Sequence, residues 1–441
     1  MDGASVGIVS RPDAADCDRS HIYSFVGSKQ QPVERREQVC WEAARPIIEK
    51  QDLAACVPVC LRALLRDDRS GRVAGTLRVI VFGGCVVVLH AACGFPRPAD
   101  GPGDDGGVDS AGAPDAQTCF GKFLRICFAS APSQPLTIST PSMIDTDSPL
   151  CASVVSGGDN YCVIAATNIT VSAAVRATGT KPLVLIATES IMTTALIDVG
   201  SYRDGTASFV GPAAIGAGAD PRSCAAGTLP PAGGGRAGGS FAGLGGVGGL
   251  ASDGSSGGSP AATVAGVPEL RGGCPSPIGT TTNVGGYGGG AVFLMAGQLI
   301  NVQGGINASG ASGRGAGPGN KGGFGGGSGG MIGLEAPTIM CSSLLLASGG
   351  GGGGGSSGIT PGGDGHDPAT IDAALGGTGP NNANGGDGSS SSSRTAPGAP
   401  GHQGDSGGQG AGGGAGGGGA GLIKAPLTAE LGTMVSPPPT P

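Results

Sequence analysis

Short apolar runs followed by alternating apolar and polar residues recur along the chain from residue 162 onward. The clearest is AVFLMAGQLINVQGGINASG at 291–310, and a near copy, MIGLEAPTIMCSSLLLASGG, follows at 331–350. Looser copies lie at 162–179 and 182–201, and a weaker fifth copy lies at 421–435. Alternation with a period of two predicts β-strands that bury one face.

Four isoleucines align the copies: Ile169, Ile191, Ile300 and Ile339. The alternate positions that follow each isoleucine hold mostly aliphatic residues and end in small ones. The apolar run before the isoleucine predicts a second strand in three copies, at 183–187, 292–296 and 332–336. In the clearest copy the expected core residues are Val292, Leu294, Ile300, Val302 and Ile306.

A unit of two strands cannot bury its apolar face alone, whereas a stack of such units can. We therefore predict an all-β fold for residues 162–441: a parallel β-solenoid, or β-helix-like stack, with long glycine-rich loops. The glycine tracts at 200–290, 310–330 and 349–419 are then excursions between turns, with either polyglycine-type packing or disorder. Cys341 occupies an inward position and is expected to be a buried free thiol.

Composition supports one thin core. Of 441 residues, 93 are Gly, and aromatic residues make up only 3%, so bulky side chains are concentrated in the repeats. The formal charge of −7 gives no basic surface, and nucleic-acid binding is disfavoured for that reason.

The N-terminal part of the chain differs from the rest. Residues 1–76 are Arg-rich, hold the only Trp, and are expected to be a poorly ordered extension that reflects a misplaced translation start. Arg69, Arg72 and Arg78 precede an apolar run that ends in small residues, and residues 77–93 are therefore typical of a signal peptide. The run is shorter than the roughly 20 residues of a membrane-spanning helix. The sequence therefore predicts export.

The segment Leu89-His90-Ala91-Ala92-Cys93 is similar to a bacterial lipobox. This pattern predicts lipidation of Cys93 and a membrane contact through the lipid anchor. His90 stands where Leu is usual, so ordinary signal-peptidase cleavage stays open as the alternative. Residues 94–118 are rich in Pro, Gly and Asp and predict a flexible tether.

Export makes disulfides the expected state of the downstream cysteines. Residues 119–161 are predicted to form a small cap stapled by two short bridges, although other pairings are formally open. The candidate pairs are Cys119 with Cys127, Cys151 with Cys162, and Cys224 with Cys274 in the longest glycine tract. Three aromatic residues of the cap are expected to cover the open end of the strand stack: Phe120, Phe123 and Phe128.

Motifs for catalysis are weak. The residues Gly404-Asp405-Ser406-Gly407-Gly408 match the surroundings of a serine-protease nucleophile, but they lie in a polar tract without a suitable base. Asp364 and Asp367 lie in GGDGHDPAT, a single partial match to a calcium-binding nonapeptide, and are weak calcium candidates. The sequence shows no carboxylate pair or metal-ligand cluster, so we expect neither a cofactor nor an enzyme.

Seven blocks carry a resemblance over residues 119–441: CFGKFLRICF, IDTDSPLC, CVIAATNITVSAAVRATGTKPLVLIAT, AGGSFAG, ELRGGCP, GGAVFLMAG and GGSGGMIGLEAPTI. They resemble glycine-rich surface lipoproteins, chiefly of myxobacteria and their relatives, whose function is uncharacterised. The leading hypothesis is an exported structural or adhesion-type protein of the outer membrane, cell surface or extracellular polysaccharide matrix. The alternatives are a carbohydrate-active β-helix enzyme and a calcium-stabilised secreted module.

Overall fold

The computed structural model describes residues 79–82, 85–88, 118–151, 157–158, 160–203, 215–219, 224–264, 266–267, 269–277, 285–390, 393–405 and 410–441. The chain divides into two compact units, residues 1–105 and 106–441. In the first unit, strands β1 (Val79–Phe82) and β2 (Cys85–Val88) pair antiparallel. They lie within the predicted signal peptide. The predicted extension at 1–76 lies outside the described residues.

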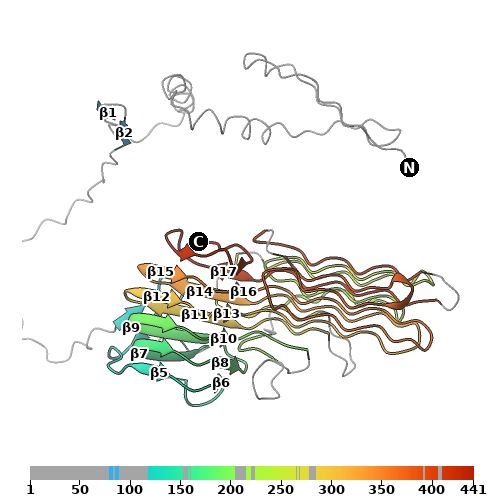
Figure 1. The fold of residues 1–441 in the computed structure, drawn as a ribbon, viewed down its shortest axis with the longest axis horizontal. Helices are drawn as coiled ribbons and strands as arrows, with labels where there is room; N and C mark the ends of the chain where they lie inside the picture. The colour runs from blue at the N-terminus through green and yellow to red at the C-terminus, as the bar shows by residue number, and fades with distance from the viewer. Residues whose placement is uncertain are drawn as a thin grey trace, which may run out of the picture. The chain divides into compact units, whose positions relative to one another are not determined.

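The second unit contains two sheets of parallel strands and a two-stranded hairpin (Figure 1). The larger, nine-stranded sheet contains β5 (Leu136–Ile138), β7 (Cys162–Val171), β9 (Leu183–Thr193), β11 (Ala291–Ala296), β12 (Leu299–Val302), β14 (Met331–Glu335), β15 (Thr338–Cys341), β17 (Leu422–Lys424) and β18 (Glu430–Leu431). The six-stranded sheet contains β6 (Ser142–Asp145), β8 (Val175–Thr178), β10 (Ile197–Asp198), β13 (Ile306–Asn307), β16 (Leu345–Leu346) and β19 (Val435–Ser436).

The register of the sheets follows the sequence repeat. Ile169 pairs with Ile191, Ile191 with Ile300, and Ile300 with Ile339 across adjacent strands. The alignment of the four isoleucines is therefore confirmed, and the weak fifth copy supplies β17, β18 and β19. Equivalent side chains stack because each copy places its aliphatic residue on the same inward face.

The β-solenoid predicted from the sequence is wrong. The strands form parallel sheets, one of them curled into a half-barrel, and not a solenoid stack. The chain leaves the sheets after β10, β13 and β16, and it returns at β11, β14 and β17 only after a glycine-rich excursion. Inward alternation is the same in both architectures, so the repeat predicted the strand register without revealing the course of the connections.

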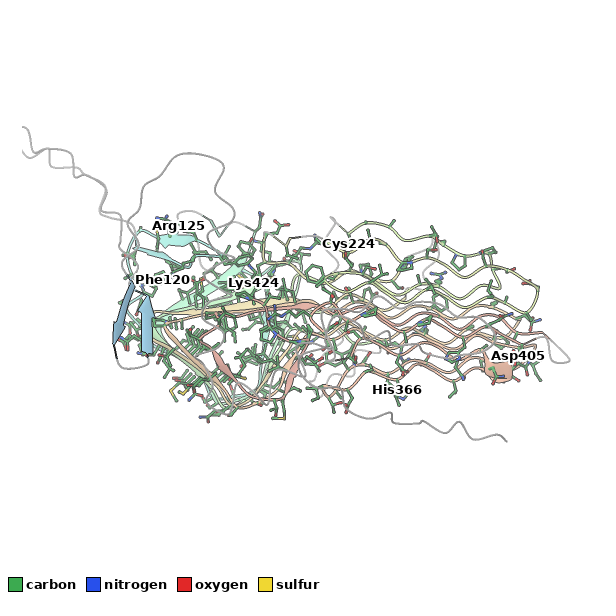
Figure 2. All side chains as sticks on the ribbon, turned by 90° about the horizontal axis from the view of Figure 1, so that it is seen from above. Phe120, Arg125, Cys224, His366, Asp405 and Lys424 are labelled. Atoms are coloured by element: carbon green, nitrogen blue, oxygen red, sulfur yellow. A yellow bond between two sulfur atoms is a disulfide. The ribbon has the colours of Figure 1, made fainter. Side chains whose placement is uncertain are left out.

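The main core lies on the inward face of the strands. The five core residues predicted in the clearest copy are all buried there: Val292, Leu294, Ile300, Val302 and Ile306. The opposite face of the larger sheet is buried in a second cluster, which includes Phe293 and the hairpin formed by β3 (Thr118–Phe120) and β4 (Ile126–Phe128). The labelled Phe120 lies with this hairpin in Figure 2.

The hairpin aromatics cover a sheet face, and not the end of the stack as predicted. The ring centroid of Phe123 lies 5.6 Å from that of Phe293, and Phe120 and Phe128 form an edge-to-face pair. Glu335, at the end of β14, accepts the backbone amides of Lys122 and Phe123. These contacts hold the hairpin against strands that are far away in sequence.

The excursions form an ordered body that we call the glycine bundle: segments 233–239, 243–251, 255–259, 271–277, 285–290, 308–319, 322–330, 347–357, 361–366, 374–379, 383–389, 396–404 and 411–421. These segments run side by side away from the sheets (Figure 1). Of the two alternatives for the glycine tracts, polyglycine-type packing or disorder, these segments show packing.

Hydrogen bonds in the bundle recur at every third residue. Gly413, Gly416 and Gly419 donate to segment 233–239, whereas Gly414, Gly417 and Ala420 donate to segment 396–404. A period of three is that of the polyproline II helix, which makes no internal hydrogen bonds and so presents its amides to neighbours.

Segment 411–421 lies at the centre of such an arrangement. It donates to segments 233–239, 347–357 and 396–404, and it accepts from segments 243–251, 322–330 and 383–389. Glycine is required here because neighbouring backbones approach closely. A Cβ added to Gly417 would lie 1.9 Å from the carbonyl oxygen of Asp387. The bundle therefore replaces a side-chain core with backbone hydrogen bonds.

Candidate functional site

Three disulfides join the cysteines that the sequence pairs. Cys119 and Cys127 lie opposite each other in the β3–β4 hairpin, and Cys151 is bonded to Cys162 at the start of β7. The third, Cys224–Cys274, closes a loop with a sequence separation of 50. Cys341 is a buried free thiol in β15, as predicted, and burial raises its pKa. A buried thiol with a raised pKa is a poor nucleophile, and Cys341 is therefore a core residue.

Cys93, the predicted lipidation site, lies outside the described residues. Where the structure is described, none of the helices has the length and hydropathy of a membrane span.

Asp364 and Asp367 are held by protein groups. Asp364 pairs with Arg203 at 2.7 Å and accepts the amide of Gly315, while Asp367 accepts the amides of Ser312 and Arg203. Within the described part of the chain, no group of three or more His, Cys, Asp or Glu residues could hold a metal ion. These carboxylates satisfy amides on one side of the bundle.

The period of three explains the positions of the two carboxylates. Ser312 and Gly315 are three residues apart, so their amides leave segment 308–319 on the same side. The next position on that side is Pro318, which has no amide hydrogen to satisfy. The partial calcium motif thus supplies hydrogen-bond acceptors for an edge of the bundle.

The far end of the bundle is a set of loops joined by polar side chains. Asn320 Oδ1 accepts the amide of Gly358, and the amide nitrogen of Asn381 donates to Ser357 Oγ. Asp405, labelled in Figure 2, accepts from Asn382 at 2.5 Å. Asp405 belongs to the protease-like motif, and its candidate nucleophile Ser406 lies outside the described residues. Asp405 thus links its own loop to the loop that contains Asn382.

A buried polar network, which the sequence analysis missed, lies where the six-stranded sheet meets the bundle. Arg176 on β8 and Asp198 on β10 are each 1% exposed, and Nη1 lies 3.0 Å from Oδ2. Tyr202 and Asn307 each donate to Asp198 at 3.0 Å, and the guanidinium of Arg176 stacks over the Tyr202 ring. Burial raises the pKa of Asp198, and the neighbouring charge of Arg176 offsets only part of that rise.

The aligned copies carry a signal for this network. Arg176, Asp198 and Asn307 each follow the inward aliphatic residue of a short strand, and the sheet register places them side by side. Three polar residues at one aligned position indicate a polar column. Burial and Asp198 also raise the pKa of Tyr202, so its hydroxyl keeps its proton and donates. The network satisfies its own charges and has the character of a structural tie.

A pocket of about 300 Å³ lies between the start of segment 233–239 and the residues that flank the turn at 318–320. It is lined by Pro230, Pro231, Ala232, Gly234, Arg236, Ala316, Gly317, Lys321, Gly322 and Phe324. Two cationic side chains therefore border one cavity, and the lining contains no carboxylate. Bulky side chains inside a glycine tract are the sequence signal that could have pointed to this pocket.

Arg236 is the central side chain of the pocket. Its guanidinium carbon lies 4.4 Å from the centroid of the Phe324 ring, a cation–π contact that fixes the plane of the group. Its Nη1 is buried and has no hydrogen-bond partner among the described residues. Burial lowers the pKa of Arg236, since a cation withdrawn from water loses hydration. The arrangement is suited to holding an anion.

Comparison with known proteins does not extend these observations. No protein family, characterised protein or solved structure matches the chain.

Proposed function

We propose that the protein is a non-enzymatic structural or adhesion-type protein of the cell surface or extracellular space. In this proposal the parallel sheets anchor the glycine bundle, and the bundle presents its end loops. The observation that carries it is the hydrogen bonding of segment 411–421 to neighbours on all sides. A body held together by its backbone keeps a fixed shape, and such rigidity suits a scaffold.

Export is the second part of the proposal. Three disulfides within residues 119–274 favour an oxidising compartment. The signal-peptide pattern at 77–93 and the resemblance to glycine-rich surface lipoproteins favour the same location. We propose that a lipid on Cys93 attaches the protein to the membrane, and that the glycine bundle faces a cell-surface or polysaccharide matrix.

The two alternatives receive less support. Most glycoside hydrolases use a pair of carboxyl groups that flank the scissile bond, and the pocket at Arg236 has no carboxylate in its lining. A calcium-stabilised module needs free carboxylate oxygens, whereas Asp364 and Asp367 are engaged by Arg203 and by backbone amides.

Intact-mass analysis of the protein from the membrane fraction, combined with protease treatment of intact cells, tests the proposal. We expect an N-terminal residue Cys93 with the added mass of a lipid, and cleavage by protease added outside the cells. A lipid-free N-terminus after Ala92 would retain export and remove the anchor. An N-terminus at Met1 with no cleavage on intact cells would contradict the whole proposal.

A further inference from the structure

The pocket beside Arg236 carries an inference that names a ligand class and builds on the proposed surface role. Arg236 belongs to segment 233–239 of the bundle, Lys321 follows the turn at 318–320, and both border the same cavity. Among the described residues neither side chain has a recorded ion pair, and Arg236 Nη1 is buried without an acceptor. Nη1 itself is closed off from solvent, so a bound anion would meet the part of the half-buried guanidinium that borders the cavity, where it offsets the cost of removing the charge from water.

Nearby carboxylates are engaged elsewhere. Asp364 reaches Gly315, next to the pocket residue Ala316, but it is paired with Arg203. Asp253 lies close to Gly233 and accepts the amide of Ser255 at 2.8 Å. The two cations of the pocket are therefore available to an external anion. Because the chain has a formal charge of −7, this is a local site, and not a broad basic surface for polyanions.

The other residues that line the pocket indicate what kind of molecule bears the anionic group. Pro230, Pro231 and Ala232 present apolar surface on the side of segment 233–239, and Leu229 beside them is 50% exposed. A volume of about 300 Å³ is at the small end of ligand pockets, which suits a single ring. Pairing a planar oxyanion with a guanidinium fixed on an aromatic ring favours a carboxylate, which the fork can bind in a bidentate manner.

We propose that this pocket binds one carboxylate-bearing sugar residue, of the uronic acid type, within an acidic polysaccharide. Arg236 and Lys321 hold the carboxylate, Phe324 positions Arg236, and the two prolines pack against the apolar face of the sugar ring. The site thereby supplies a matrix contact for the surface scaffold.

Calorimetric titration of the purified full-length chain with glucuronate and with an oligogalacturonate tests the proposal. We expect saturable binding that falls at least about tenfold in Arg236→Gln and Lys321→Gln, because each variant removes a charged hydrogen-bond partner. Arg314→Gln is the matched control, since Arg314 is exposed on the neighbouring segment and does not line the pocket. Thermal melting of each variant verifies that the fold is intact.

Three comparisons decide the ligand class. Glucose or the glucuronate methyl ester binding as tightly as glucuronate would overturn the role of the carboxylate, and inorganic phosphate binding as tightly would overturn the role of the sugar. An equal loss in Arg314→Gln, or no binding by a folded chain, would overturn the site. Because binding is measured on purified protein, its failure leaves export untouched, and failed export leaves the binding result standing.

Discussion

Arg176 and Asp198 lie side by side on strands β8 and β10, with Nη1 and Oδ2 3.0 Å apart and both residues almost fully buried. The same guanidinium donates to the carbonyl of Gly200 at 2.6 Å, where the chain leaves the sheet for the bundle. The ion pair thus joins the sheet to the first residues of the glycine-rich excursion. We infer that it stabilises the junction of the two parts.

Removal of one partner of the Arg176–Asp198 pair should lower the stability of the fold. Asp198→Ala leaves the Arg176 charge buried, and we expect a loss of about 3–5 kcal/mol in the free energy of unfolding. Arg176→Met combined with Asp198→Leu removes both charges and should recover much of that loss. Urea unfolding followed by circular dichroism measures both variants. Equal stability of Asp198→Ala and the unaltered protein would contradict the assigned role.

The bundle should not tolerate side chains at its centre. A Cβ on Gly417 meets the carbonyl oxygen of Asp387 at 1.9 Å, whereas nothing lies within 4 Å of a Cβ on Gly317. We expect Gly417→Ala to lower the free energy of unfolding by roughly 1–3 kcal/mol or more, and Gly317→Ala to change it little. Thermal unfolding compares the two, and similar melting temperatures would argue against close packing in solution.

Calcium should have no effect on folding of the bundle. The oxygens of Asp364 and Asp367 already accept hydrogen bonds from Arg203, Ser312 and Gly315. The melting temperature is therefore expected to be the same in excess calcium and in chelator. A higher melting temperature in excess calcium than in chelator would instead support the hypothesis of a calcium-stabilised module.

The hydrogen bond that Asp367 accepts at the edge of the bundle should contribute measurably to stability. Asp367→Ala leaves the buried amide of Ser312 without its acceptor, and we expect a loss of about 1–3 kcal/mol in the free energy of unfolding. Asp372→Ala is the control, because Asp372 is exposed and its recorded hydrogen bonds are to Thr370. Denaturant titration separates the two variants, and equal stability would show that the cap contributes nothing.

Cys341 should be unreactive until the protein unfolds. Its thiol is buried in β15, and burial raises its pKa, so little thiolate forms near neutral pH. We expect the peptide containing Cys341 to remain unmodified by iodoacetamide in native buffer and to be alkylated in denaturant. Peptide mass mapping gives the result residue by residue. Rapid native labelling would mean that β15 opens readily.

The sequence by itself determined the strand repeat and its inward residues, and it offered the three cysteine pairs as candidates. Period-two alternation identifies buried strand faces wherever a chain folds this way, so Ile169, Ile191, Ile300 and Ile339 could be aligned before the structure was known. Close spacing along the chain also suggested two of the three disulfides.

Only the tertiary structure decided what the glycine tracts do. Glycine carries no side-chain pattern, so the partners of segment 411–421 depend on contacts between residues far apart in sequence. The same holds for the pocket, because Arg236 meets Lys321 and Phe324 only when segment 233–239 packs against the stretch that contains them. The pocket and the half-barrel therefore follow from the path of the connections, which local alternation of residues does not encode.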